Sequence, residues 1–272
     1  MIRLVFVDVD GTLVGEKGVP PCVWPAVEKA RRRGLRLSLL TGRPGRGEAL
    51  ALAQRLAPEG LHVFESGAVV LALTQDPHEP PVKPLRVEAL PLEAAQEAVR
   101  LARRLGLPLE GYTAEGGFYV EGDSPLLKAH QALLGVEAEG ADLLRLGSPL
   151  VRLQVLAEAH APLEVFLEGL PPGLAAHVAE SPKMPGVRFV SLTKKGVGKL
   201  SAARFVAEAY GLSLEECAMV GDGENDLEVI RAVGLGIAMG NAPERVKRAA
   251  QKVVAPVEAC GLAEALDLLN PP

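Results

Sequence analysis

The chain of 272 residues contains little cysteine and no long hydrophobic run. Its three cysteines, Cys22, Cys217 and Cys260, are odd in number and far apart. This spacing matches neither a disulfide framework nor a zinc site, so we expect reduced thiols in a cytoplasmic protein. No apolar run approaches the ~18 residues of a membrane-spanning helix. The apolar stretch that precedes Asp8 is also too short for a signal peptide.

An excess of positive charge is missing as well. The chain has 29 Lys and Arg against 34 Asp and Glu, a formal net charge of −5. We therefore expect neither nucleic acid nor an anionic membrane as the main partner. Hydrophobic residues make up 48% and charged residues 23%, which is typical of a folded protein. Asn and Gln are scarce whereas Arg and Pro are plentiful, a composition that hints at a thermophile.

Both ends of the chain alternate apolar runs with stretches of helical period. The run "RLVFVDVD" is continuous, as in a strand buried on both faces of a parallel sheet, and the helical "VWPAVEKARRRG" and the strand-like "LRLSLLTGR" follow. The alternation resumes near the C-terminus with "KLSAARFVAEAYG", "ECAMVGDGEND" and "LGIAMG". Asn241 lies three residues before Glu244, the spacing of a capping box. The pattern predicts an α/β fold with a doubly wound, Rossmann-like parallel-sheet core.

The middle of the chain has a different pattern. Two Pro-rich stretches, "TQDPHEPPVKP" and "ESPKMPG", enclose segments that read as helices and strands with denser turns. We expect a smaller inserted α+β domain over residues 83–187, with an antiparallel sheet that faces solvent on one side. Residues 1–82 and 188–272 would then form the α/β core.

Polar residues follow three of the expected strands at their carboxyl ends, in "DVDGTL", "LLTGR" and "GDGENDL". Ligands of open parallel sheets bind at this edge, so these residues should converge on one spot. Asp8 and Asp10 are two apart at a strand end and should project to the same side, where one can attack while the other handles protons. Clustered carboxylates repel one another unless a hard cation such as Mg²⁺ lies among them.

Four segments together resemble a known family. "DVDGTL", "LLTGR", "GVGKLSAARFVAEAYGL" and "MVGDGENDLEVIRAVGLGIAMGNA" are similar, in this order, to the four motifs of the haloacid dehalogenase (HAD) superfamily of phosphohydrolases. The order and the long insert resemble the Cof-like branch with a type IIB cap. The resemblance implies a Mg²⁺-dependent phosphatase that hydrolyses small phosphorylated metabolites, such as sugar phosphates, through an aspartyl-phosphate intermediate.

The resemblance also implies roles for individual residues. Asp8 matches the nucleophile, and Asp10 matches the general acid and base. The residues expected to hold the substrate's phosphoryl group are Thr41, Gly42, Lys199 and Asn225. Those expected to hold Mg²⁺ are Asp8, Asp10 through its backbone carbonyl, Asp222 and Asp226.

Several alternatives remain open at this point. Lys194 and Lys195 are rivals of Lys199, Arg43 could simply pair with a core carboxylate, and Asn225 could be a turn residue. A phosphomutase of the same superfamily and a catalytically silent metabolite-binding regulator are the other candidate functions. Dehalogenation requires neither a second aspartate nor a metal, so Asp10 and Asp222 speak against it. The five histidines show no ligand spacing and receive no role, and neither the substrate, nor the cap residues that contact it, nor the oligomeric state follows from the sequence.

Overall fold

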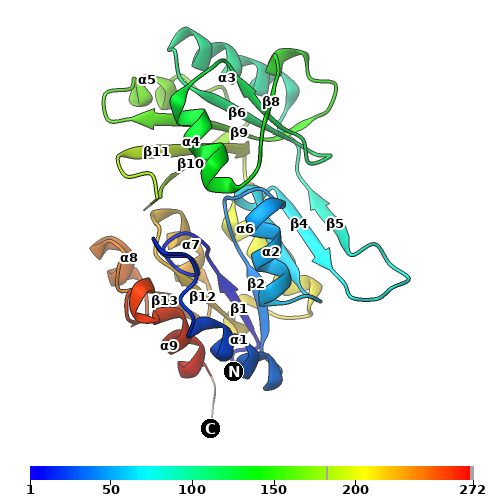
Figure 1. Ribbon diagram of the computed structural model, residues 1–272, viewed down its shortest axis with the longest axis vertical. Helices are drawn as coiled ribbons and strands as arrows, with labels where there is room; N and C mark the ends of the chain where they lie inside the picture. Colours follow the sequence, from blue (N-terminus) through cyan, green and yellow to red (C-terminus); the bar gives the residue numbers. More distant parts are fainter. Residues whose placement is uncertain (182, 270–272) are drawn as a thin grey trace.

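The computed structural model describes residues 1–181 and 183–269, which form a lower α/β unit and an upper unit with its own sheet (Figure 1). The lower unit is built on a five-stranded parallel sheet in the order β14-β13-β12-β1-β2. Its strands are β1 (Leu4–Val7), β2 (Arg36–Leu39), β12 (Cys217–Gly221), β13 (Leu235–Ala238) and β14 (Lys252–Val253).

Helices cover both faces of this sheet, which is why all four residues of β1 are buried. Val5 and Val7 pack on the side of α1 (Val23–Arg32), α2 (Gly47–Leu56) and α9 (Gly261–Leu268). Leu4 and Phe6 pack on the side of α6 (Lys199–Ala209), α7 (Leu227–Ala232) and α8 (Glu244–Ala249). The continuous apolar run of β1 is therefore explained, and the prediction of a doubly wound α/β core is confirmed.

The upper unit contains a six-stranded sheet in the order β10-β11-β9-β6-β7-β8, which is antiparallel apart from the β7–β8 pair. The strands are β6 (Leu109–Thr113), β7 (Phe118–Glu121), β8 (Glu139–Gly140), β9 (Leu150–Glu158), β10 (Leu174–Glu180) and β11 (Val187–Lys194). The helices are α3 (Leu92–Arg104), α4 (Pro125–Leu134) and α5 (Leu163–Glu168). One face of the sheet packs against α3 and α5. We expected the other face in solvent, but it is turned toward the core and helps to enclose a cavity there.

A small antiparallel sheet connects the two units. It consists of β3 (Leu61–Phe64), β4 (Val69–Leu73) and β5 (Val82–Val87), in that order. Two strands thus lie across the expected limits of the insert. β5 begins at residue 82 but pairs with β4, and β11 begins at residue 187 but pairs with β9 and β10.

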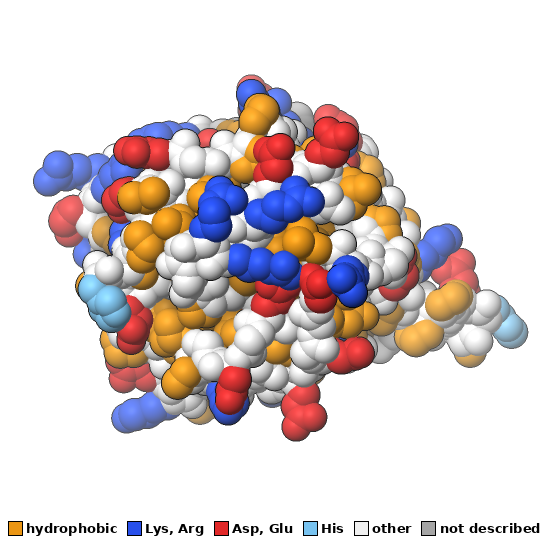
Figure 2. All heavy atoms as spheres, turned by 90° about the horizontal axis from the view of Figure 1, so that it is seen from above, with side chains coloured by type: hydrophobic (Ala, Val, Ile, Leu, Met, Phe, Trp, Pro, Cys, Tyr) orange, Lys and Arg blue, Asp and Glu red, His pale blue; other side chains and the backbone are white. Residues whose placement is uncertain are grey.

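The outer face of the upper unit carries charges of both signs. Figure 2, which looks onto this face from above, shows Lys and Arg side chains near the middle with acidic and apolar side chains around them. Arg103 on α3, for example, bonds to Glu121 and Asp142. None of the helices in the described residues is long and apolar enough to cross a membrane.

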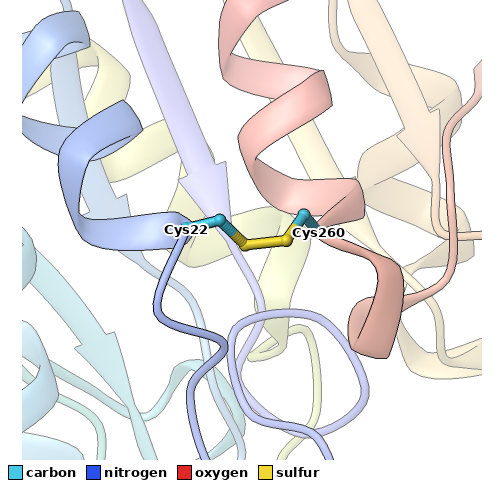
Figure 3. Close-up of a disulfide and its surroundings, with 2 residues drawn as sticks. All are labelled: Cys22 and Cys260. Atoms are coloured by element: carbon cyan, nitrogen blue, oxygen red, sulfur yellow. A yellow bond between two sulfur atoms is a disulfide. The ribbon is translucent and has the colours of Figure 1, made fainter.

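A disulfide joins Cys22 to Cys260, so our expectation of three reduced thiols is wrong (Figure 3). The two residues are 238 apart in the sequence, yet their Cα atoms lie 6.2 Å apart. They immediately precede α1 and α9, which pack against each other on the same face of the core sheet. Cysteine spacing could not reveal this contact because opposite ends of the chain supply the two helices. Cys217 is a buried free thiol, and burial raises its pKa to about 11.

We expect the disulfide to stabilise the core substantially. Replacing both Cys22 and Cys260 by serine should lower the free energy of unfolding by about 2–4 kcal/mol, because the cross-link restricts the unfolded chain. Thermal denaturation should show a midpoint lower by about 5–15 °C. The double variant also supplies the control, since a phosphine reductant should destabilise the parent and leave the variant unchanged. Equal midpoints for parent and variant would contradict a stabilising role.

Candidate active site

A cavity of about 570 Å³ lies between the core and the upper unit. Its floor is the carboxyl edge of the core sheet, where β1, β2 and β12 end side by side. Six of the residues singled out from the sequence line it: Asp8, Asp10, Thr41, Gly42, Asp222 and Asn225. The remaining two, Lys199 and Asp226, are buried next to Asp8 beneath it. The structure therefore brings together all eight residues, as strand ends of a parallel sheet should.

Asp8, Asp222 and Asp226 form an acidic triad. Each offers one carboxylate oxygen, and these oxygens lie within 4.8 Å of one another. Burial, and next the charge of Asp226, raises the pKa of Asp8 to about 7. Burial, and next the charge of Asp8, raises the pKa of Asp222 to about 8. Three hard oxygen ligands at a site that resists ionisation suit a divalent cation, because the cation would relieve the repulsion.

Lys199 is the cation that the chain itself supplies to this triad. It is the first residue of α6 and is 5% exposed. Its Nζ donates hydrogen bonds to Asp8 Oδ1 at 2.7 Å and to Asp226 Oδ1 at 2.6 Å. Burial lowers its pKa, but the two carboxylates outweigh burial and raise it overall. The rivals Lys194 and Lys195 are both exposed, at the end of β11 and just after it, and Lys194 pairs with Glu88, so of the three lysines Lys199 is the one placed at the site.

The loop after β1 holds Asp222 through residues that the sequence analysis missed. Thr12 donates from Oγ1 to Asp222 Oδ1 at 2.8 Å. Gly11 adopts a φ of +80°, and a Cβ there would lie 2.1 Å from Asp222 Oδ2, so only glycine fits. Asn241 donates from Nδ2 to the Gly11 carbonyl at 2.9 Å and to Asp222 Oδ2 at 3.3 Å.

This use of Asn241 overturns the expected capping box. The residue before α8 is Pro243, and no side chain caps the helix. The Asn241 side chain instead donates from Nδ2 to the Gly11 carbonyl in the loop after β1. Its Oδ1 accepts a hydrogen bond from the backbone N–H of Val257 at 2.9 Å. A capping-box spacing and a tertiary contact use the same residue types, so spacing alone could not separate them.

Arg43 holds the carboxylate of Asp10. Its Nε donates to Asp10 Oδ2 at 2.9 Å and its Nη2 donates to Asp10 Oδ1 at 2.8 Å. Its Nη1 donates to Glu48 Oε2 at 2.7 Å, and Arg43 is only 5% exposed. The open alternative for Arg43 is therefore settled in favour of a core carboxylate. Because its side chain is held in this way, Asp10 stands apart from the acidic triad and leaves its backbone carbonyl as the ligand that the family resemblance implies.

We expect Arg43→Lys to lower kcat for an alkyl phosphate about tenfold. Lysine keeps the charge but cannot hold both oxygens of Asp10, and one misaligned proton-transfer group costs at least this much. Steady-state kinetics would measure the effect. Glu48→Gln is the matched control, since it removes the outer partner of Arg43 and leaves the pair with Asp10 intact, and its kcat should stay within about twofold of the parent's. A kcat for Arg43→Lys equal to that of the parent would contradict this role.

Thr41, Gly42 and Ser66 form a second side of the cavity floor. Thr41 is 1% exposed, and its Oγ1 accepts a hydrogen bond from the Arg43 backbone N–H at 3.1 Å. Ser66 has a φ of +55°, which is strained for serine, and its backbone N–H donates to the Thr41 carbonyl. Strain of this kind concentrates at functional sites, but no signal in "FESGAV" could have shown it. Asn225 lines the cavity from the single 3-10 turn Glu224–Asp226 that precedes α7, a place that suits both its alternatives, a turn residue and a contact of the phosphate.

Comparison with known proteins agrees with this geometry. A family model described as haloacid dehalogenase-like hydrolase matches residues 5–266. A phosphoglycolate phosphatase of Methanopyrus kandleri is 26% identical over 260 residues, which are 93% of this chain and 91% of that protein. An HMP-PP phosphatase of Cronobacter sakazakii is 25% identical over 245 residues, with 89% and 85% covered.

Solved structures show the same architecture. A haloacid dehalogenase-like hydrolase from Bacteroides thetaiotaomicron has a TM-score of 0.80 at 25% identity, with 99% of this chain and 100% of that chain covered. A sugar phosphatase of HAD subclass IIB has a TM-score of 0.82 at 23% identity, with 98% of each chain covered, and so shares the fold. The resemblance read from the four motifs is confirmed, and the chain belongs to the haloacid dehalogenase-like hydrolases, a family of enzymes.

Proposed function

We propose that this hydrolase of phosphate esters is a Mg²⁺-dependent phosphatase that transfers the phosphoryl group to Asp8 and then to water. The observation that carries the proposal is the position of Asp8. Its carboxylate lies at the floor of the cavity, within reach of two other carboxylates, and accepts a hydrogen bond from the buried ammonium of Lys199. A nucleophile in this setting attacks an incoming phosphorus atom while Lys199 offsets the charge on the phosphoryl oxygens.

The neighbouring side chains divide the remaining work. Asp10, oriented by Arg43, protonates the leaving oxygen and later removes a proton from the attacking water. Thr41, Gly42 and Asn225 line the floor next to Asp8 and would bind the phosphoryl oxygens. Ser66 adds a further hydroxyl on that side. The covalent intermediate is an aspartyl-phosphate on Asp8, which fits a site that holds a carboxylate nucleophile and a separate proton carrier.

The residues present suit Mg²⁺. Asp8, Asp222 and Asp226 offer oxygen ligands only, and burial together with their mutual repulsion raises the pKa of Asp8 and of Asp222 even with Lys199 in place, so a further cation would favour their ionised forms. When bound, Mg²⁺ would neutralise these carboxylates and the phosphate together. Thr12 and Asn241 hold Asp222 in orientation for that purpose.

Metal removal tests the proposal directly. Hydrolysis of p-nitrophenyl phosphate should require Mg²⁺ and should fall at least about 100-fold after dialysis against EDTA. Added Mg²⁺ should restore it, and Ca²⁺ should restore little because its looser coordination displaces the nucleophile. Full activity in EDTA after exhaustive dialysis would contradict the proposed dependence on Mg²⁺.

The upper unit would act as a cap that selects the organic half of the substrate. The comparisons include proteins named as sugar, phosphoglycolate and HMP-PP phosphatases, so a small phosphorylated metabolite is the substrate class that we propose. The hydrogen-bonded sheets favour a cap from Glu88 to Lys195, so that both limits lie a few residues closer to the C-terminus than residues 83 and 187, the limits expected from composition.

A cytoplasmic location fits this substrate class, since charged metabolites of this kind are retained inside cells. The Cys22–Cys260 disulfide is uncommon in the cytoplasm of mesophiles but frequent in that of hyperthermophiles. The scarcity of Asn and Gln points to the same kind of source.

A further inference from the structure

The cap side of the cavity is the polar face of the six-stranded sheet. Glu110, Gln154, Ser191 and His177 lie directly across from one another on β6, β9, β11 and β10. We call these four residues the polar row. Alternate residues of a strand share a face, so the intervening positions point the other way and form the apolar core with α3.

Three members of the polar row, Glu110, Gln154 and Ser191, are buried and hydrogen-bonded to one another, whereas His177 is half-buried and bonds to Thr193. Glu110 is fully buried and accepts from His130 Nδ1 at 2.7 Å, from the Tyr112 hydroxyl at 2.8 Å and from Gln154 Nε2 at 2.9 Å. Ser191 donates to Gln154 Oε1 at 3.0 Å. Burying a sheet face between two layers costs the least free energy when the face is apolar. The buried polar cluster therefore suggests a role in function rather than in folding.

Arg152 links the polar row to the core. It is 1% exposed, its Nε donates to Glu65 Oε2 at 2.6 Å, and its guanidinium lies 3.8 Å above the Tyr112 ring. Its Nη1 donates to Gln154 and Ser191. Glu65 belongs to the core turn just before Ser66, so this buried ion pair crosses the cavity margin from cap to core.

Two nitrogen atoms of this cluster remain available. Within residues 1–181 and 183–269, neither Arg152 Nη2 nor His130 Nε2 has a hydrogen-bond partner, although every fully enclosed side-chain polar atom there has one. Both residues line the cavity, so these atoms reach its open space. Because His130 Nδ1 faces the Glu110 carboxylate, Nδ1 carries a proton and Nε2 is the ring nitrogen left for a ligand.

The charges of this wall are already balanced. Arg152 is offset by Glu65, and His130 lies against Glu110. In the core, Arg43 is engaged by Asp10 and Glu48. The further acidic residues that line the cavity are Glu180 and Glu224. An additional carboxylate on the substrate would therefore meet no unpaired cation among the described cavity residues, whereas a hydroxyl could accept from Arg152 Nη2 and, since a hydroxyl both donates and accepts, pair with His130 Nε2.

We propose that Arg152, His130 and Ser191 form a leaving-group subsite that binds an uncharged, hydroxyl-bearing organic half and discriminates against a carboxylate in the same position. The inference rests on the proposed function for the direction in which the ester lies, with its phosphoryl group on Asp8. It explains why a polar row is buried at the one sheet face that meets the substrate. The subsite should affect the choice between substrates, because a ligand that leaves buried hydrogen-bond donors and acceptors unpaired binds less tightly.

A matched pair of esters tests the subsite. Glycerol 3-phosphate and 3-phosphoglycerate differ in a hydroxymethyl group against a carboxylate. Titration calorimetry with the Asp8→Asn protein in Mg²⁺ should show at least tenfold tighter binding of glycerol 3-phosphate. His130→Asn keeps a donor toward Glu110 but removes Nε2, and Ser191→Ala removes the hydroxyl; either change, added to Asp8→Asn, should narrow the ratio to about threefold or less. Val178→Ala, a change at a cavity residue on β10 outside the polar row, should leave the ratio unchanged.

The outcomes separate the subsite from the proposed function. Equal or tighter binding of 3-phosphoglycerate, or ratios in the His130 and Ser191 variants equal to that of the Val178 control, would overturn the subsite. If the parent hydrolyses phosphate esters but shows no preference, the subsite fails alone. If the preference is found but the parent hydrolyses no ester with any divalent cation, the proposed function fails and the subsite stands. Should His130→Asn not fold, Ser191→Ala decides.

Discussion

Asp8→Asn is expected to abolish turnover while leaving the fold intact. An amide oxygen is a far weaker nucleophile than a carboxylate, so no phosphoryl group should be transferred to residue 8. The loss should be at least about 10⁴-fold in kcat, equivalent to about 5.5 kcal/mol in the activation barrier. Initial rates with p-nitrophenyl phosphate in Mg²⁺ would measure it, and circular dichroism would confirm the fold.

Asp10→Asn provides the contrast. It should still allow attack by Asp8 on an ester with a good leaving group, but the phosphorylated protein should persist because no base activates water. Mass spectrometry of the acid-quenched Asp10→Asn protein should place the added phosphate on Asp8. Near-normal rates in the Asp8→Asn protein, or an adduct on another residue, would assign the nucleophile elsewhere.

The metal-free protein is expected to lose stability as the pH rises toward 8. The folded-state pKa of Asp8 is raised to about 7 and that of Asp222 to about 8, both from an ordinary value of 3.8. The folded state therefore holds protons that the unfolded state releases. Stability from this source is fully present below pH 3.8 and is lost as the pH rises through 7 and 8. The loss should be at least about 2–3 kcal/mol between pH 5 and 8, which is the contribution of the Asp8 shift alone.

Urea denaturation in EDTA at a series of pH values would measure this loss. His62 acts in the opposite sense, because burial lowers its pKa from 6.5 to about 4, and its stabilising contribution is lost as the pH falls through that window. Comparison with Asp222→Asn cancels His62, and the variant should show the smaller decline. Saturating Mg²⁺ should flatten the parent's curve, since a bound cation favours the ionised carboxylates. Parallel curves for parent and variant in EDTA would show that the triad does not titrate in this range.

The sequence allowed the floor of the site to be predicted because strand ends constrain it. Asp8 and Asp222 each follow a strand directly and Thr41 follows one after a single residue, and parallel strands bring their carboxyl ends to one edge. Lys199 could be separated from Lys194 by its position at a helix start. For these residues, local pattern and tertiary position are tied by the geometry of the sheet itself.

Contacts that cross the fold could not be predicted in this way. Thr12 forms a hydrogen bond with Asp222, which is 210 positions away in the sequence, and Asn241 forms one with Gly11, which is 230 positions away. Hydrophobic periodicity shows which face of a helix or strand is buried, but not which side chain of another helix, strand or loop it contacts. The same holds for His130 in the cap, whose ring has no sequence partner at ligand spacing yet lies 2.7 Å from Glu110. Composition also did not show that β5 and β11 would run across the predicted limits of the insert at residues 83 and 187.

The order of strands in the core sheet determines when the sheet can be completed during protein synthesis. β1 lies between β2 and β12, and β12 ends at Gly221, 182 residues after β2 ends at Leu39. At a synthesis rate of about 5–20 residues per second, one edge of β1 therefore stays unpaired for about 10–40 s, until β12 has been synthesised. The strands of the cap are continuous in the chain and all precede β12. The cap can therefore complete its sheet on the ribosome while the nascent catalytic half still exposes an open apolar strand, the stage at which chaperones would be needed most.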